Sequence, residues 1–166
     1  MQALVKGGWE KPDMAVSSSK QATPCNCTAL RKATRRVSQL YDVALEPSGL
    51  KTTQRAILSQ ILRSGTPHIG ELAEALVMDR GALTHNLKPL ERDGLVKITT
   101  DPDDRRNRIL ALTAAGRARL AQSDALWAGA QRGFEAAFGA AKSASLRKAL
   151  EYVVSDDFAA AFNHPG

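Results

Sequence analysis

The 166-residue chain is poor in aromatic and cysteine side chains and has no long apolar run. An aromatic content of 5% argues against a surface that stacks the bases of single-stranded nucleic acid. Two cysteines cannot form a disulfide framework, and we expect a reducing, cytoplasmic compartment. Because no run of about 18 apolar residues occurs and the N-terminus lacks the apolar segment of a secretory signal, we expect no membrane partner.

The motifs of common enzyme classes are also missing. The sequence has no G-x-S-x-G, no H-E-x-x-H and no glycine loop of the kind that cradles phosphate. The C-x-C of Cys25 and Cys27 supplies only two metal ligands, and the three histidines fall at no zinc spacing. We therefore expect no enzyme activity, no metal site and no cofactor.

Positive charge is what the chain does have. Its formal net charge is +6 and its pI is near 9.6. Such a balance favours a polyanionic partner, of which nucleic acid is the commonest.

Apolar residues at helical spacing predict six helices and one hairpin. Residues 1–24 lack this spacing and are expected to form a flexible extension. A helix over residues 25–48 precedes one that follows "KTT", whose threonines are expected to cap it and which should bury Ile57, Leu58, Ile61 and Leu62. Asp79 should cap a later helix, "RGALTHNLKPLERDG", and Thr113 a long one, and the last helix should run from about Ser143 to Phe158.

The order of these elements predicts a mainly α fold with a small β-wing. Two short helices before the hairpin form a helix-turn-helix, and the hairpin forms the wing. We expect a winged helix-turn-helix domain over residues 49–113 and further helices over residues 114–162.

The helix after Asp79 has an outward face suited to a DNA major groove. With Leu83 facing the core, the helical period turns Gly81, His85, Lys88 and Arg92 outward and places Thr84 on the flank. A solvated polar face would have the same composition, so the helix alone leaves both interpretations open. Pro89 should lie towards the outer side and kink the helix, making that side convex.

The loop "DPDDRRNR" (residues 101–108) joins the two predicted strands. Arginine suits a narrow minor groove, and a paired aspartate would hold its guanidinium in place. A merely solvated hairpin loop is the alternative interpretation.

The segment "DRGALTHNLKPLERDGLVKITTDPDDRRNRILALTAAGRARL" resembles the MarR family of winged-helix transcription factors. The resemblance as a whole covers about residues 25–160. The resemblance rests on two groups of matching residues. They are Asp79, Arg80, Thr84, Leu90, Glu91, Gly94, Leu95 and Val96, then Asp104, Arg106, Leu112, Thr113 and Gly116.

The resemblance implies an obligate homodimer whose N- and C-terminal helices interlock and which binds pseudo-palindromic double-stranded DNA. It implies that Arg106 enters the minor groove and that Asp104 braces it. Together with the outward face, the expected DNA-binding residues are Arg80, Gly81, Thr84, His85, Lys88, Arg92, Asp104, Arg105, Arg106 and Arg108.

One position departs from the family pattern. His85 stands where the family usually has arginine, and neutral imidazole binds phosphate more weakly than guanidinium. We therefore expect DNA binding to change between about pH 6 and 7.

The sequence offers candidate residues for an effector site and for a redox site. Many MarR proteins release DNA when a small aromatic or anionic effector binds, and Tyr41, Arg63 and His68 are the candidate residues here. Some relatives sense peroxide through an N-terminal cysteine, and Cys25 and Cys27 lie at a helix start with basic neighbours that lower a thiol pKa. Ordinary thiols packed near the dimer seam are the alternative, and are favoured.

The predicted function is that of a dimeric repressor released from its operator by a small effector. A thiol-based redox regulator is the alternative within this class. A winged-helix dimer that binds protein without binding DNA is the alternative from another class.

Overall fold

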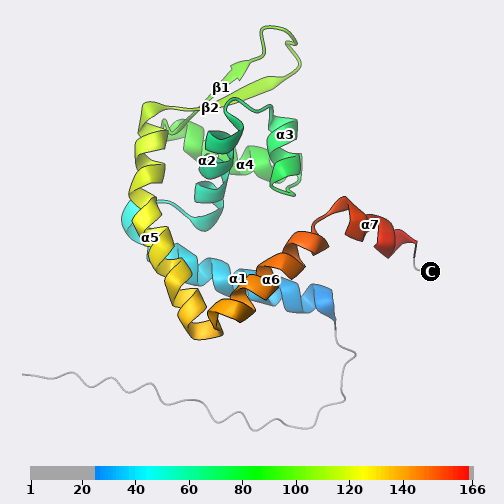
Figure 1. Cartoon of the computed structure of the whole chain (residues 1–166). Helices are drawn as coiled ribbons and strands as arrows, with labels where there is room; N and C mark the ends of the chain where they lie inside the picture. Colours follow the sequence, from blue (N-terminus) through cyan, green and yellow to red (C-terminus); the bar gives the residue numbers. More distant parts are fainter. Residues whose placement is uncertain (1–24, 165–166) are drawn as a thin grey trace, which may run out of the picture.

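The computed structural model describes residues 25–164, so the expected flexible extension over residues 1–24 lies outside it. Figure 1 shows the wing at one end of the molecule, and α1 and α6 towards the other. The elements follow in the order α1 (Asn26–Leu45), the 3₁₀ turn η1 (Glu46–Ser48), α2 (Thr52–Ser64), α3 (Ile69–Ala75), α4 (Arg80–Arg92), β1 (Val96–Thr100), β2 (Arg108–Leu112), α5 (Ala114–Phe138), α6 (Ala140–Val153) and α7 (Asp156–Asn163). The predicted mainly α fold with a small β-wing is confirmed.

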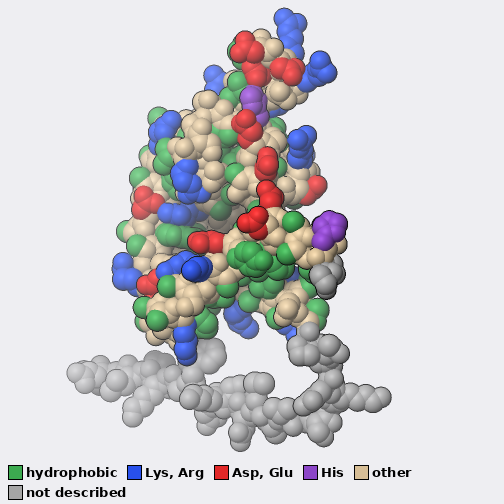
Figure 2. Space-filling view, turned by 45° about the vertical axis from the view of Figure 1, so that its right-hand side comes forward, with side chains coloured by type: hydrophobic (Ala, Val, Ile, Leu, Met, Phe, Trp, Pro, Cys, Tyr) green, Lys and Arg blue, Asp and Glu red, His purple; other side chains and the backbone are tan. Residues whose placement is uncertain are grey.

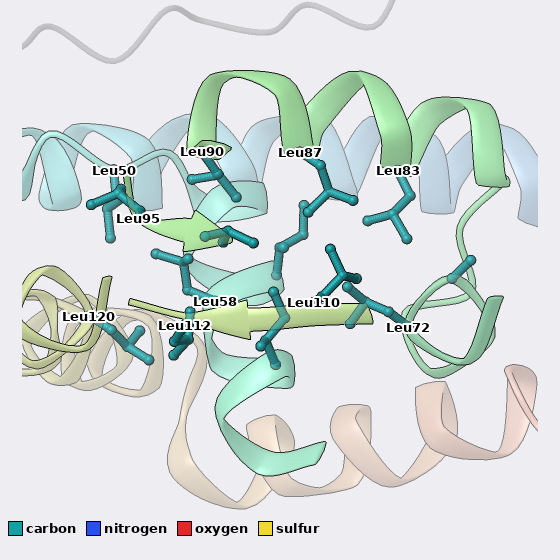
Figure 3. Close-up of a cluster of buried hydrophobic side chains, with 14 residues drawn as sticks. Leu50, Leu58, Leu72, Leu83, Leu87, Leu90, Leu95, Leu110, Leu112 and Leu120 are labelled. Carbon is teal, nitrogen blue, oxygen red and sulfur yellow. The ribbon is translucent and has the colours of Figure 1, made fainter. Parts of the chain in front are cut away.

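Residues 49–113, here called the winged domain, enclose one leucine-rich core. The two strands pair antiparallel from Val96↔Leu112 to Thr100↔Arg108. In Figure 3, leucines of α4 point towards leucines of β2, with α2 beside them. The most completely buried of these side chains are Ile57, Leu58, Ile61, Leu83, Leu90 and Leu110, all at 0% exposure. This packing fixes α4 and the wing relative to one another.

The remaining helices, α1, α5, α6 and α7, are here called the terminal helices. Figure 1 shows α5 running from the wing to the far end of the molecule, where it meets α1 and α6. Within the described part of the chain, Ser143 is the one buried residue of α6, and α7 has no buried residue. The space-filling view shows apolar side chains gathered in this half of the molecule (Figure 2).

The start of α2 differs from the prediction. Lys51, not a threonine, occupies the N-cap position, and Thr52 is already helical. Both the backbone N–H and the hydroxyl of Thr52 donate to Asp42 Oδ1 at 2.7 Å. A carboxylate of α1 therefore satisfies the first turn of α2, and the expected local cap was wrong.

Two further expectations are corrected. Leu62 was expected in the core but is 48% exposed, because it lies at the edge of the apolar face of α2. The last helix was expected to be continuous, but it ends at Val153 and α7 begins at Asp156. Ser155 separates them, since its hydroxyl oxygen accepts the Phe158 N–H at 3.2 Å and caps α7.

The junction between the wing and α5 is tightly packed. Thr113 caps α5 as predicted, accepting the Gly116 N–H at 3.0 Å. Its hydroxyl also donates to Gly94 O at 2.6 Å. Any Cβ at position 116 would collide with the Leu95 carbonyl oxygen. Glycine is needed there because α5 passes directly against the backbone that leads into β1.

Candidate nucleic-acid interface

The helix α4 presents the outward face that its spacing predicts. Asp79 caps it, accepting the N–H of Gly81 at 2.8 Å and of Ala82 at 3.1 Å. Leu83, Leu87 and Leu90 are buried. The residues expected on the outward face and its flank are all exposed, namely Gly81, Thr84, His85, Lys88 and Arg92.

Three residues of α4 are constrained by local contacts. The Thr84 hydroxyl donates to Arg80 O at 2.7 Å, which leaves its oxygen free to accept. Arg92 Nε donates to Asp93 Oδ1 at 2.9 Å, so its charge is partly neutralised. A Cβ at Gly81 would lie 2.9 Å from Asp79 Oδ1, which gives this glycine a role in capping besides any close approach of DNA.

Pro89 is half-buried, and α4 runs through it from Arg80 to Arg92. Its carbonyl accepts the Asp93 N–H at 2.9 Å. The expected position towards the outer side and the expected kink both stay predictions.

The wing loop carries its arginines far from the core. The Arg106 side chain is 95% exposed, with Nε 3.7 Å from Asp104 Oδ1. Asp104 Oδ1 also accepts the Arg106 N–H at 3.0 Å. The Asp104 carboxylate therefore contacts the backbone of the loop more closely than it contacts the Arg106 guanidinium. Figure 2 shows basic side chains at the tip of this projection.

A hollow of about 650 Å³ lies between the wing and the helices α3 and α4. It collects part of the predicted DNA-binding set, namely Arg80, Thr84, Arg106 and Arg108. The Arg108 guanidinium donates a hydrogen bond to the Thr100 hydroxyl oxygen. Residues of the helix and of the wing therefore form one continuous surface, with Arg105 exposed beside it and His85, Lys88 and Arg92 further along α4.

The three candidate effector residues do not form one site. His68 lies at the hollow beside the wing. Arg63 is exposed on α2, where it donates to Ser59 at 2.8 Å and to Gln60 at 2.5 Å. Only Tyr41 lies among the terminal helices, so the grouping expected from the sequence is wrong.

Tyr41 borders an apolar groove of about 330 Å³ between α1, α5 and α6. Its hydroxyl donates to Gln131 Oε1 at 3.0 Å, and its ring meets that of Trp127 edge-on at 4.9 Å. Burial raises the pKa of Tyr41, so this hydroxyl keeps its proton. Phe134 and Arg147 line the same groove.

Cys25 and Cys27 are exposed free thiols. Cys25 is the N-cap of α1, and its sulfur accepts from the Thr28 hydroxyl at 3.3 Å and from the Thr28 N–H at 3.5 Å. The hydrogen bond from the hydroxyl is the largest cause that lowers the pKa of Cys25 below its ordinary value of 9.0. This thiol therefore has increased thiolate character.

One link in the interface was missed by sequence reasoning. Asp101, the first residue of the predicted wing loop, is 8% exposed, and its Oδ2 lies 2.7 Å from His68 Nε2. The two residues are 33 positions apart, and no local spacing indicates their contact.

The structure describes no metal-binding or membrane-spanning feature over residues 25–164. No three His, Cys, Asp or Glu side chains within this range are grouped to hold a metal ion. None of its helices is both long and apolar enough to cross a bilayer.

Known proteins resemble both the sequence and the fold. A model of the MarR family matches residues 48–107. The Mycobacterium tuberculosis transcriptional regulator MosR, solved in complex with DNA, is 37% identical with a TM-score of 0.66, and the match covers 78% of this chain and 98% of MosR. The transcriptional repressor CouR, bound to a 23-mer DNA duplex, is 28% identical with a TM-score of 0.72, over 79% of this chain and 93% of CouR.

A curated relative covers a shorter region. The transcriptional activatory protein BadR of Rhodopseudomonas palustris is 38% identical over 77 residues, which are 45% of this chain. The chain thus matches 44% of BadR, less than half of that protein. These relatives include a protein described as a repressor and one described as an activator.

Proposed function

The chain belongs to the MarR family of winged-helix transcriptional regulators, and on that premise we propose that it represses transcription as a homodimer on a pseudo-palindromic operator. The observation that carries the proposal is the continuous surface formed by α4 and the wing. This surface combines the exposed face of α4 with the exposed Arg106 in the loop of the wing. The strands of the wing pack on the core of the winged domain. Relatives that share this fold have been solved on DNA duplexes.

In this proposal, each element contacts a different part of the duplex. The exposed residues of α4 enter the major groove, where Thr84 and His85 reach base edges or phosphates and Lys88 binds phosphate. Arg106 enters the adjacent minor groove. Arg80, Gly81, Arg92, Arg105 and Arg108 complete the DNA-binding set, and Asp104 fixes the loop that carries Arg106.

The homodimer is supported by the terminal helices. Leu40 and Phe138 are 58% and 45% exposed, and both line an apolar groove of about 500 Å³ between α1 and α5. A second copy that covers this groove would place two recognition helices on half-sites about 34–36 Å apart, or a multiple of that distance. Dimerisation by residues 25–48 and 114–162, with DNA binding by residues 49–113, follows from this arrangement.

A salt titration tests DNA binding. On the promoter fragment upstream of its own gene, the logarithm of the affinity should fall linearly and steeply with the logarithm of salt concentration. Arg106→Ala should weaken binding by about 1–3 kcal/mol, whereas Arg132→Ala, an exposed arginine of α5, should not. A protein-binding winged dimer would show no retardation of DNA at low salt and no difference between the two variants.

Release by a small effector is supported by the groove beside Tyr41. It is mainly apolar, with the Arg147 guanidinium and the Tyr41 hydroxyl at its wall. An aromatic carboxylate could place its ring among the apolar side chains and its charge near Arg147. Benzoate derivatives should lower the DNA affinity of the wild-type protein and have less effect on Arg147→Gln. An equal response of the two proteins would exclude this groove.

A second candidate is thiol-based control, which the exposure of Cys25 and its hydrogen bonds with Thr28 favour. Peroxide would then oxidise Cys25 to a sulfenic acid, which could condense with a second thiol. DNA affinity should fall on treatment of the wild type and recover with dithiothreitol. A Cys25→Ser, Cys27→Ser variant that responds identically would remove this candidate.

A further inference from the structure

His68 lies between the helix-turn-helix and the wing. It precedes α3 as its N-cap residue, and it forms an isolated antiparallel bridge with Ile109 of β2. Next to it, the Pro67 carbonyl accepts the Leu110 N–H at 3.0 Å. These backbone contacts attach β2 to the segment that leads into α3, and β1 is attached through its pairing with β2.

Asp101 attaches the other side of the wing. Its Oδ2 lies 2.7 Å from His68 Nε2, and its Oδ1 accepts the Asp103 N–H at 2.9 Å. The Asp101 N–H donates to Asn107 O, and the Asn107 N–H donates to Asp104 O. A connected set of hydrogen bonds thus runs from the helix-turn-helix into the loop that carries Arg106.

Both nitrogens of the His68 ring face carboxylates. Nε2 meets Asp101, and Nδ1 lies 3.4 Å from Glu71 Oε2, the oxygen that accepts the His68 N–H at 2.8 Å. A neutral imidazole has one N–H and can donate to one of these groups, while its other nitrogen directs a lone pair at the second carboxylate. A protonated imidazole donates to both.

We propose that His68 is a positioning residue for DNA binding, whose protonated ring fastens the base of the wing to the start of α3 and thereby holds Arg106 in place. The proposal rests on the proposed DNA-binding function. It adds to that function a pH-dependent joint between the start of α3 and the base of the wing.

The charges around the ring agree with this assignment. The groups that line the same hollow are Glu71 and Glu74 from α3, Arg80 from α4, and Arg106 and Arg108 from the wing, with Asp101 at its base. The hydrogen bond to Asp101, followed by that to Glu71, raises the pKa of His68 above its ordinary value of 6.5. The pKa of Asp101 is lowered, first by the Asp103 N–H and then by His68.

The sign of the pH effect follows from the raised pKa of His68. The joint should be complete below pH 6.5 and should be lost as pH rises through the higher pKa of the folded protein. Wing order, and with it DNA affinity, should therefore fall over this range, which lies above that of an ordinary histidine.

The first test compares pH profiles of DNA affinity for the full chain on a promoter duplex at constant ionic strength. Between about pH 5.5 and 9, wild-type affinity should fall by about threefold or more as the joint is lost. His68→Gln, which can still donate to Asp101 but does not titrate, should lose this step. His164→Gln is the matched control, since it removes an exposed histidine that lies outside the proposed DNA-binding set, and it should keep the step. An identical profile for wild type and His68→Gln would overturn the proposal.

The second test needs no DNA. NMR titration should give a His68 pKa above 6.5 that decreases in Asp101→Asn, and the amides of residues 103–107 should become more mobile as His68 deprotonates. A His68 pKa that is unaffected by Asp101→Asn would overturn the proposal. If the wild type fails to bind DNA at any pH, the proposed function falls, while this titration still decides the role of His68.

Discussion

The winged domain and the terminal helices differ in how completely their large apolar side chains are buried. The core cluster of buried residues lies within residues 50–112 except for Leu120. Among the described residues, twelve large apolar side chains are exposed: Leu62 and Val77 belong to the winged domain, nine lie on the terminal helices, and Val154 lies between α6 and α7. The winged domain therefore completes its own core, whereas the terminal helices present an apolar surface that a second copy would cover.

The difference separates two tasks. A domain that reads DNA must hold α4 and the wing in fixed relation, and its core does this within one chain (Figure 3). In the proposed homodimer, the terminal helices would set the distance between two such domains, and this requires an interface and not a closed core. We expect substitutions in the winged domain to change stability, and substitutions in the terminal helices to change assembly.

The largest expected effect is on assembly. Leu40→Glu would place a carboxylate in the groove between α1 and α5 of each copy, and should weaken the homodimer at least about 100-fold because the charge would lose its water. Sedimentation velocity measures this. Leu62→Glu is the matched control, since Leu62 is similarly exposed, at 48% against 58%, but lies in the winged domain. If both variants sediment like the wild type, the assigned interface is wrong.

A smaller effect is expected on stability at the junction of the two regions. Gly116→Ala would drive a methyl group into the Leu95 carbonyl oxygen and should lower the free energy of unfolding by about 1–3 kcal/mol. Gly129→Ala lies in the same helix, where the nearest atom, Arg132 Nη2, is 3.9 Å from the added Cβ. It should leave stability unchanged or raise it by up to about 1 kcal/mol. Urea unfolding should distinguish the two, and equal stabilities would contradict the tight packing at residue 116.

The smallest effect concerns a strained residue in the otherwise well-packed winged domain. Val77, in the turn between α3 and α4, has a φ of +50° and is 70% exposed. A β-branched residue is strained in this conformation. Val77→Gly should therefore raise the free energy of unfolding by about 1 kcal/mol.

The control for this substitution is Lys88→Gly, at an exposed position inside α4. It should lower the free energy of unfolding by about 1 kcal/mol, because glycine disfavours a helix interior. Thermal unfolding in which both variants lose stability would show that position 77 is not strained.

The winged domain was predictable from sequence where its signals are local. Asp79 as a cap, the spacing of Leu83, Leu87 and Leu90, and Thr113 as a cap were all confirmed, because each depends on residues a few positions apart. The direction of the α4 face followed from the same spacing. Its proposed contacts with DNA stay predictions.

Features that depend on distant partners were missed. Asp42 caps α2 from another helix, and His68 meets Asp101 across 33 positions. Apolar spacing continues from Val153 to Phe158, but Ser155 captures the Phe158 N–H and divides the helix there. Periodicity likewise cannot tell where a neighbouring element stops covering a helix, which is why Leu62 was wrongly placed in the core.

The central claim is that two copies, joined by their terminal helices, present two winged domains to one duplex. Light scattering of the full chain, alone and with its promoter duplex, tests it most directly. The chain has a mass of 17.8 kDa, so the account predicts twice that mass for the free protein at about micromolar concentration, and two chains per duplex in the complex. A free protein of 17.8 kDa that binds DNA as a single chain would contradict it.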